Sequence, residues 1–117
     1  MMREEGPPLR TRGPLVQPAG MKLTADQIKE RLAGLAGWTL DGAAIRRQFV
    51  FDGFASAVSF VVRVGFDAEA ADHHPDILIS SYKKVTLTFT THSAGGLTEK
   101  DFAAAEAADR VFDGQAG

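Results

Sequence analysis

All three histidines of the chain, His73, His74 and His92, lie within one short stretch of sequence. Imidazole is the side chain best suited to exchange protons near neutral pH. Two carboxylates, Glu69 and Asp101, flank the stretch, and a carboxylate can fix the tautomer of an imidazole and increase its basicity. No serine stands in a nucleophile-elbow motif and the chain has no cysteine. The stretch therefore predicts acid–base chemistry without a covalent intermediate.

A predicted hairpin explains how these histidines could meet. Strands are expected over residues 77–80 and 83–90, and in the second of them apolar residues alternate with threonines. The turn between the two strands is centred near Tyr82. In an antiparallel pair, residues equally far from the turn lie opposite each other. The histidine pair at 73 and 74 should therefore lie close to His92, at the open end of the hairpin.

Simpler roles remain open for each of these residues. Histidines at a helix C-terminus complement the helix dipole, Asp101 could cap the last helix, and Glu69 could be a surface charge. Three imidazoles and a carboxylate could also bind zinc or iron. Because the histidines lack the H-x-H or H-x-x-x-H spacing that aims two rings at one point, we favour acid–base catalysis without a metal.

Composition sets the wider limits. The chain has 117 residues, 44% of them hydrophobic, a formal net charge of -2 and no cysteine. This length suits one domain. The charge argues against direct binding of nucleic acid or of an anionic membrane, and the lack of cysteine excludes disulfides and thiolate metal sites. No bilayer-spanning run or signal peptide is evident, so we expect a soluble cytoplasmic protein.

Residues 1–20 differ from the rest of the chain. Four of the five prolines fall there, together with glycines and mixed charges. Such a stretch has too little apolar surface to offset the entropy cost of ordering, so we predict a flexible extension. Residues 21–117 should form one domain.

Hydrophobic periodicity and turn residues predict seven elements in the order α-β-β-α-β-β-α. Short connections make consecutive strands antiparallel, and the predicted fold class is α+β, a four-stranded antiparallel sheet with three helices on one face. The expected elements are a helix capped by Thr24 and ending at Gly34 to Gly37, a strand over 37–40, a turn at Asp41-Gly42, a strand over 44–51, a helix capped by Asp52 and reaching about Asp72, the hairpin described above, and a helix from Thr98 to about Phe112.

The apolar patterns also predict which faces are buried. In the second strand one parity is apolar, with Arg47 interrupting it. The expected buried row of the second helix consists of Phe54, Val58, Val61, Val62, Gly65 and Ala68.

The segment from Glu69 to Asp101 resembles the signature of a known family. The residues that carry the resemblance are Glu69-Ala-Ala-Asp-His73-His74-Pro75, Tyr82, Val85, Thr91-His92, Gly96-Leu97-Thr98 and Asp101. They are similar to the pterin-4a-carbinolamine dehydratases, a family also known as the dimerisation cofactor of a homeodomain transcription factor. The resemblance extends over roughly Leu23 to Phe112, and Ile77 and Lys83 depart from the usual family pattern.

This resemblance implies a reaction. The substrate would be a 4a-hydroxytetrahydropterin, made by an aromatic amino acid hydroxylase, and the loss of water would give a quinonoid dihydropterin in tetrahydrobiopterin recycling. No metal and no redox cofactor would be needed. The implied catalytic set is His73, His74, His92 and Asp101, with acid–base roles for His73 and His92, a mainly binding role for His74, and an orienting role for Asp101.

The resemblance also implies a pterin pocket and an assembly. Asp72, His73, His74, Thr90, Thr91, His92 and Ser93 would bind the substrate, and Glu69 would support the site from behind. The protein would form a homodimer or homotetramer. An interaction protein that resembles a transcriptional coactivator and uses the same scaffold is the alternative function.

Overall fold

The computed structural model describes residues 20–116. Its elements are α1 (Ala25–Ala33), β1 (Thr39–Asp41), β2 (Ala44–Val50), α2 (Phe54–Ala71), β3 (Asp76–Ser80), β4 (Lys84–Phe89), a short 3-10 helix (His92–Ala94) and α3 (Glu99–Ala116). The four strands form one antiparallel sheet in the order β1-β2-β4-β3. The predicted α+β fold and element order are therefore confirmed.

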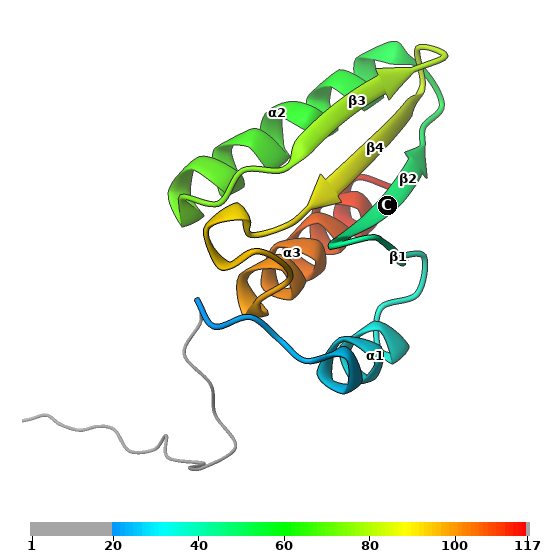
Figure 1. The fold of residues 1–117 in the computed structure, drawn as a ribbon. Helices are drawn as coiled ribbons and strands as arrows, with labels where there is room; N and C mark the ends of the chain where they lie inside the picture. The colour runs from blue at the N-terminus through cyan, green and yellow to red at the C-terminus, as the bar shows by residue number, and fades with distance from the viewer. Residues whose placement is uncertain (1–19, 117) are drawn as a thin grey trace, which may run out of the picture.

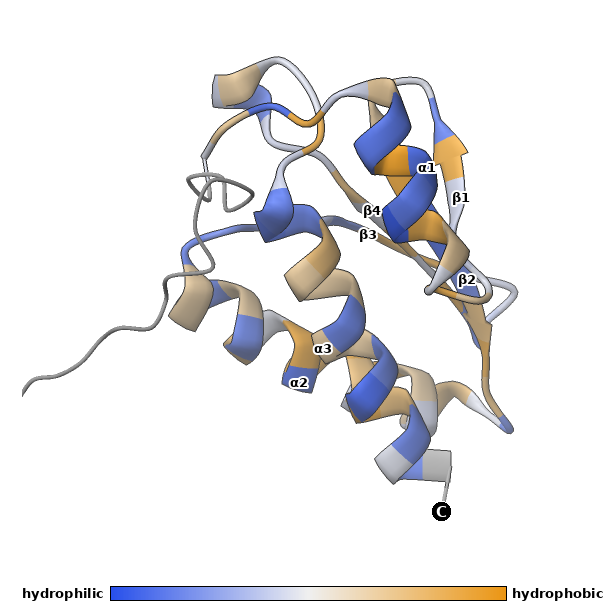
Figure 2. Cartoon of the chain, turned by 90° about the horizontal axis from the view of Figure 1, so that it is seen from below, coloured by the Kyte–Doolittle hydropathy of each residue, from blue (hydrophilic) through white to orange (hydrophobic). Residues whose placement is uncertain are grey.

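The helices and the sheet form layers (Figure 1). Figure 2 shows α2 and α3 running side by side beneath the sheet, with α1 near β1. An ion pair between Arg31 of α1 and Glu99 of α3 joins these two helices. The side-chain hydrogen bond to Glu99 raises the pKa of the Arg31 guanidinium above its ordinary value.

The core lies between the sheet and the helices. In β4, Val85, Leu87 and Phe89 are buried and alternate with half-buried threonines, as predicted. The parity predicted for the second strand is also confirmed, because Ile45 and Phe49 are almost fully buried. Aromatic rings pack against one another at the centre of the core, where Phe60 of α2 contacts Phe49 and Phe51.

Arg47, which interrupts the apolar pattern of β2, lies on the buried face and has its own partner there. Its Nη1 donates to Oδ1 of Asp109 on α3 at 2.6 Å, and Trp38 Nε1 lies 3.0 Å from the same oxygen. The guanidinium also lies over the ring of Phe49, 4.3 Å from its centre. A cation can therefore occupy a core-facing position because a carboxylate and a π-face compensate its charge.

The start of the chain's first helix is as predicted. Thr24 accepts a hydrogen bond from the backbone N–H of Gln27, while the Gln27 side chain accepts one from the backbone N–H of Thr24. This reciprocal capping box sets the first turn of α1. The helix ends at Gly34, also as predicted.

Two predictions about α2 are wrong. Asp52 does not cap the helix, because the N-cap is Gly53 and no side-chain cap bond forms there. The predicted buried row is also largely wrong: Phe54 and Val62 are 57% and 51% exposed, and the buried residues are Ala57, Phe60, Val64 and Ala68. The helix has two apolar rows, and the row formed by Ala57, Phe60, Val64 and Ala68 faces inward.

No helix in residues 20–116 is long and apolar enough to cross a membrane. The extension predicted for residues 1–20 lies, apart from Gly20, outside the described residues.

Candidate active site

The register of the β3–β4 hairpin positions the histidine segment. Asp76 pairs with Thr88 and Ser80 with Lys84, so the turn is centred on Tyr82, as predicted. Ser81 and Tyr82 adopt positive φ angles of 49° and 54° in this turn. Extending the same register past the ladder sets His73 opposite residue 91.

The end of α2 turns His73 toward the core. The helix ends at Ala71, and Asp72 is in the left-handed conformation, with φ 51° and ψ 44°. The N–H of His73 donates to Ala68 O and the N–H of Asp72 donates to Glu69 O. This pair of backbone hydrogen bonds is typical of a Schellman motif. Because the helix ends at Ala71, His73 lies beyond the helical face that carries Glu69.

A substitution at Asp72 should test this turn. We expect Asp72→Gly to keep or slightly raise stability, whereas Asp72→Val should lower it by about 1–2 kcal/mol, because a β-branched residue is strained at positive φ. Urea unfolding followed by circular dichroism measures both changes. Equal stability of the two variants would contradict a left-handed residue at this position.

His73 and Asp101 form the centre of the site. Nε2 of His73 lies 2.6 Å from Oδ1 of Asp101, and the two side chains are 10% and 0% exposed. The imidazole is stacked on Phe89, with the ring centres 6.2 Å apart and the planes 12° from parallel. Residues 28 positions apart in the sequence thus meet in a nearly buried pair.

Asp101 also holds the start of α3. Its Oδ2 accepts the backbone N–H of Thr98 at 2.9 Å and the hydroxyl of Thr91 at 2.8 Å. The two threonine hydroxyls lie 2.9 Å apart. Both roles considered for Asp101, helix cap and partner of an imidazole, are therefore present in one carboxylate, one on each oxygen.

The other two histidines lie at the surface. His74 Nε2 is 2.9 Å from Oε1 of Glu69, in a pair whose side chains are 57% and 81% exposed. His92 begins the 3-10 helix and is exposed, and its imidazole makes no side-chain hydrogen bond within residues 20–116. The hairpin therefore brings Thr91, rather than His92, against Asp101.

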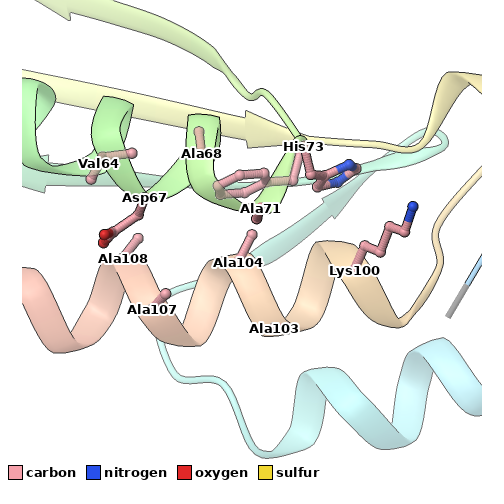
Figure 3. A pocket seen from close by; sticks show the side chains of 11 residues that line it. Val64, Asp67, Ala68, Ala71, His73, Lys100, Ala103, Ala104, Ala107 and Ala108 are labelled. Atoms are coloured by element: carbon pink, nitrogen blue, oxygen red, sulfur yellow. The ribbon is translucent and has the colours of Figure 1, made fainter.

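A cavity of about 200 Å³ opens beside His73, between α2 and α3 (Figure 3). Its walls are mostly apolar, and Asp67 and Lys100 supply the other polar groups besides the imidazole. The lining residues are Val64, Asp67, Ala68, Ala71, His73, Phe89, Lys100, Ala103, Ala104, Ala107 and Ala108. A nearly buried imidazole thus borders a space that a small molecule could enter.

Sequence reasoning did not identify Lys100, Phe89 or the alanines of α3 as parts of this region. Lys100 directly precedes Asp101, and the alanines recur at helical spacing, so a signal existed. That signal does not show which residues line a cavity, because the cavity forms only where α2 and α3 pack together. Among the residues expected to bind substrate, Thr90 and Thr91 donate their hydroxyls to other groups of the protein, to Ala43 O at the surface and to Asp101 in the interior.

Metal binding was the alternative chemistry considered for these residues. Within the described part of the chain, no three histidine, cysteine, aspartate or glutamate side chains come close enough together to hold a metal ion. The donors that do meet form two separate pairs, His73 with Asp101 and His74 with Glu69, and the remaining oxygen of Asp101 is used by two hydrogen-bond donors.

Comparisons with known proteins agree on one family. A family model described as pterin 4 alpha carbinolamine dehydratase matches residues 21–111. A protein of Roseiflexus sp. strain RS-1 is 53% identical over 91 residues, which cover 78% of this chain and 97% of that protein. One from Mycobacteroides abscessus is 49% identical over 87 residues, covering 74% and 92%. Both are provisionally named pterin-4-alpha-carbinolamine dehydratase.

A solved structure supports the same assignment. The crystal structure of a transcriptional coactivator/pterin dehydratase from Brucella melitensis superimposes with a TM-score of 0.73 at 37% identity. The match covers 77% of this chain and 97% of that one.

Proposed function

The chain belongs to the pterin 4 alpha carbinolamine dehydratase family, and from this premise we propose that it dehydrates a 4a-hydroxytetrahydropterin to a quinonoid dihydropterin. The observation that carries the proposal is the His73–Asp101 pair, a nearly buried imidazole held by a fully buried carboxylate at the edge of a cavity. Relatives near 50% identity over most of this chain carry the same activity in their names.

The reaction needs one proton added and one removed. A proton is delivered to the 4a-hydroxyl, the C4a–O bond breaks, and its electron pair leaves with the departing water. A ring N–H then gives up its proton, and that electron pair completes the new double bond. No atom changes its redox state through an external partner, so the protein has to supply only acid–base groups and a shaped site.

We assign these acid–base roles to His73 and His92. His73 has a fixed orientation and a carboxylate behind it, which suits a group that must accept a proton from the pterin ring. His92 is exposed and bears no carboxylate partner in residues 20–116, which suits a group that exchanges protons with solvent.

The remaining site residues are proposed to bind and orient the pterin. His74, supported by Glu69, and the exposed side chains of Asp72 and Ser93 face solvent near the pair. Thr90 and Thr91 would contribute backbone groups, since their hydroxyls are engaged. The pterin would come from an aromatic amino acid hydroxylase, in tetrahydrobiopterin recycling.

The direct test is the dehydration rate of a 4a-hydroxytetrahydropterin generated in situ by a phenylalanine hydroxylase reaction. We expect the purified protein to remove the absorbance of the intermediate much faster than the uncatalysed reaction does. A rate that does not depend on protein concentration would reject the proposed activity.

We also propose that the protein forms a homodimer or homotetramer. A row of apolar residues on the outer side of α2 is exposed, led by Phe66 at 70% and including Phe54 and Val62. The edge strand β3 adds Leu78, which is 59% exposed. Exposed apolar surface of this kind and an unpaired sheet edge are features that assembly would cover.

Phe66→Glu should therefore reduce the assembly to smaller species, because a charge would have to be buried in the interface. Light scattering after size-exclusion chromatography measures the mass. Gln48→Glu, which adds the same charge on an exposed β2 position, is the matched control and should leave the mass unchanged.

A wild-type monomer would contradict the proposed assembly. It would leave the α2 surface free for a different protein, and would favour the interaction function suggested by the coactivator name of the Brucella relative.

A further inference from the structure

The hydrogen bonds around Asp101 form a chain with a single consistent direction. The backbone N–H of Lys100 donates to Thr98 Oγ1 at 3.2 Å, and that of Thr98 donates to Asp101 Oδ2. Thr91 donates its hydroxyl proton to the same Oδ2, so the Thr98 hydroxyl must donate its own to Thr91. In this series of hydrogen bonds, the hydroxyl protons of Thr91 and Thr98 therefore both point toward the Asp101 carboxylate.

This direction fixes what His73 can do. A carboxylate is an acceptor only, and its Oδ2 already receives two donors, so Oδ1 is left to accept from the imidazole. Nε2 of His73 must then carry its proton. The other ring nitrogen, Nδ1, makes no hydrogen bond within residues 20–116 and holds the free lone pair of the neutral ring.

We propose that Thr91 and Thr98 are positioning residues, which act through Asp101 to keep Nε2 of His73 protonated and make Nδ1 the nitrogen that exchanges a proton with the substrate. This inference rests on the proposed function for the identity of the reaction. Thr91, Thr98 and Asp101 are here called the Asp101 clasp. They are at most 6% exposed, so water does not compete for their hydrogen bonds.

Asp101→Asn gives the sharpest test, because it keeps the shape of the side chain. With its carbonyl oxygen held by Thr91 and Thr98, the amide NH2 would face Nε2, which would have to become an acceptor. Nitrogen-15 NMR of the ligand-free protein should then show His73 protonated at Nε2 in the wild type and at Nδ1 in the variant. Dehydratase kcat should fall about 100-fold or more in Asp101→Asn.

Thr91→Val tests the threonines themselves. Without the Thr91 hydroxyl, the Asp101 carboxylate is held by one donor fewer and can turn away from Nε2. We therefore expect a mixture of His73 tautomers and a kcat lower by about 10-fold, with KM changed less than twofold. Thr91→Ser should restore both the tautomer and the rate, which a purely structural role of the methyl group would not predict. Glu99→Gln, which alters the first turn of α3 outside the clasp, should leave the His73 signals as in the wild type.

Two results would overturn the inference. One is a wild-type His73 protonated at Nδ1, and the other is a Thr91→Val variant with wild-type kcat and wild-type NMR signals. Failure of the proposed function is separate, because it would show as an inactive wild type whatever the tautomer of His73.

Discussion

His73→Ala should lower kcat/KM for the dehydration by about 100-fold to 10,000-fold, the range that a general acid–base group typically contributes. His73 is the only histidine in residues 20–116 that combines a buried carboxylate partner with a place on the cavity wall. Steady-state rates on the hydroxylase-generated intermediate measure the loss, and circular dichroism checks that the fold persists.

His74→Ala is the matched control for this experiment. Its imidazole is largely exposed and its partner Glu69 is more exposed still, so removal should act mainly on KM and by about tenfold at most. Wild-type kcat in His73→Ala, or an equal loss in both variants, would remove His73 from its assigned role.

Asp109→Ala should lower the free energy of unfolding by about 2–4 kcal/mol. Asp109 is the hydrogen-bond partner of both Trp38 Nε1 and Arg47 Nη1, and the ion-paired side chains are only 22% and 20% exposed. Its removal would leave a largely buried guanidinium without a counter-charge, which costs much more than the pair itself contributes. Chemical denaturation of both proteins measures the difference.

Arg46→Ala provides the contrast from the adjacent position of β2. Arg46 pairs with Asp41 at 3.8 Å on the exposed side, so its loss should change stability by less than about 0.5 kcal/mol. Adding Arg47→Met to Asp109→Ala should recover part of the stability, because the uncompensated charge is then gone. A double variant less stable than Asp109→Ala would contradict this explanation.

The fold could be predicted from the sequence where the local signals were unambiguous. A strand was the only element that fitted the alternation of Val85, Leu87 and Phe89, and a helix start was the only one that fitted the capping box at Thr24. Both predictions are confirmed. The hairpin register followed from the turn near Tyr82, so the approach of residue 73 to the end of β4 was also predictable.

The side of α2 that is buried could not be read from the sequence. Phe54 and Val62 are as apolar as Phe60 and Val64, and hydrophobicity alone does not choose between two such rows. The choice depends on the close packing of α3, a contact between distant parts of the chain. Arg47 is similar, since its partner Asp109 is 62 positions away.

The arrangement around Asp101 could be predicted only in part from the sequence. Asp101 was expected to cap a helix or to hold an imidazole, and geometry shows that it does both. The hydroxyls of Thr91 and Thr98 have this role only because the first turn of α3 returns to the end of β4.

Under the acid–base role proposed for His73, the shared carboxylate of Asp101 links catalysis to the local opening of a helix end. The first turn of α3 cannot open without releasing His73, because the oxygen that caps the turn and the oxygen that orients the ring belong to one group. Helix ends open locally at a lower free energy than the whole domain. On gentle heating, the protein should therefore lose dehydratase activity while most of its backbone amide protons are still protected from exchange with deuterium.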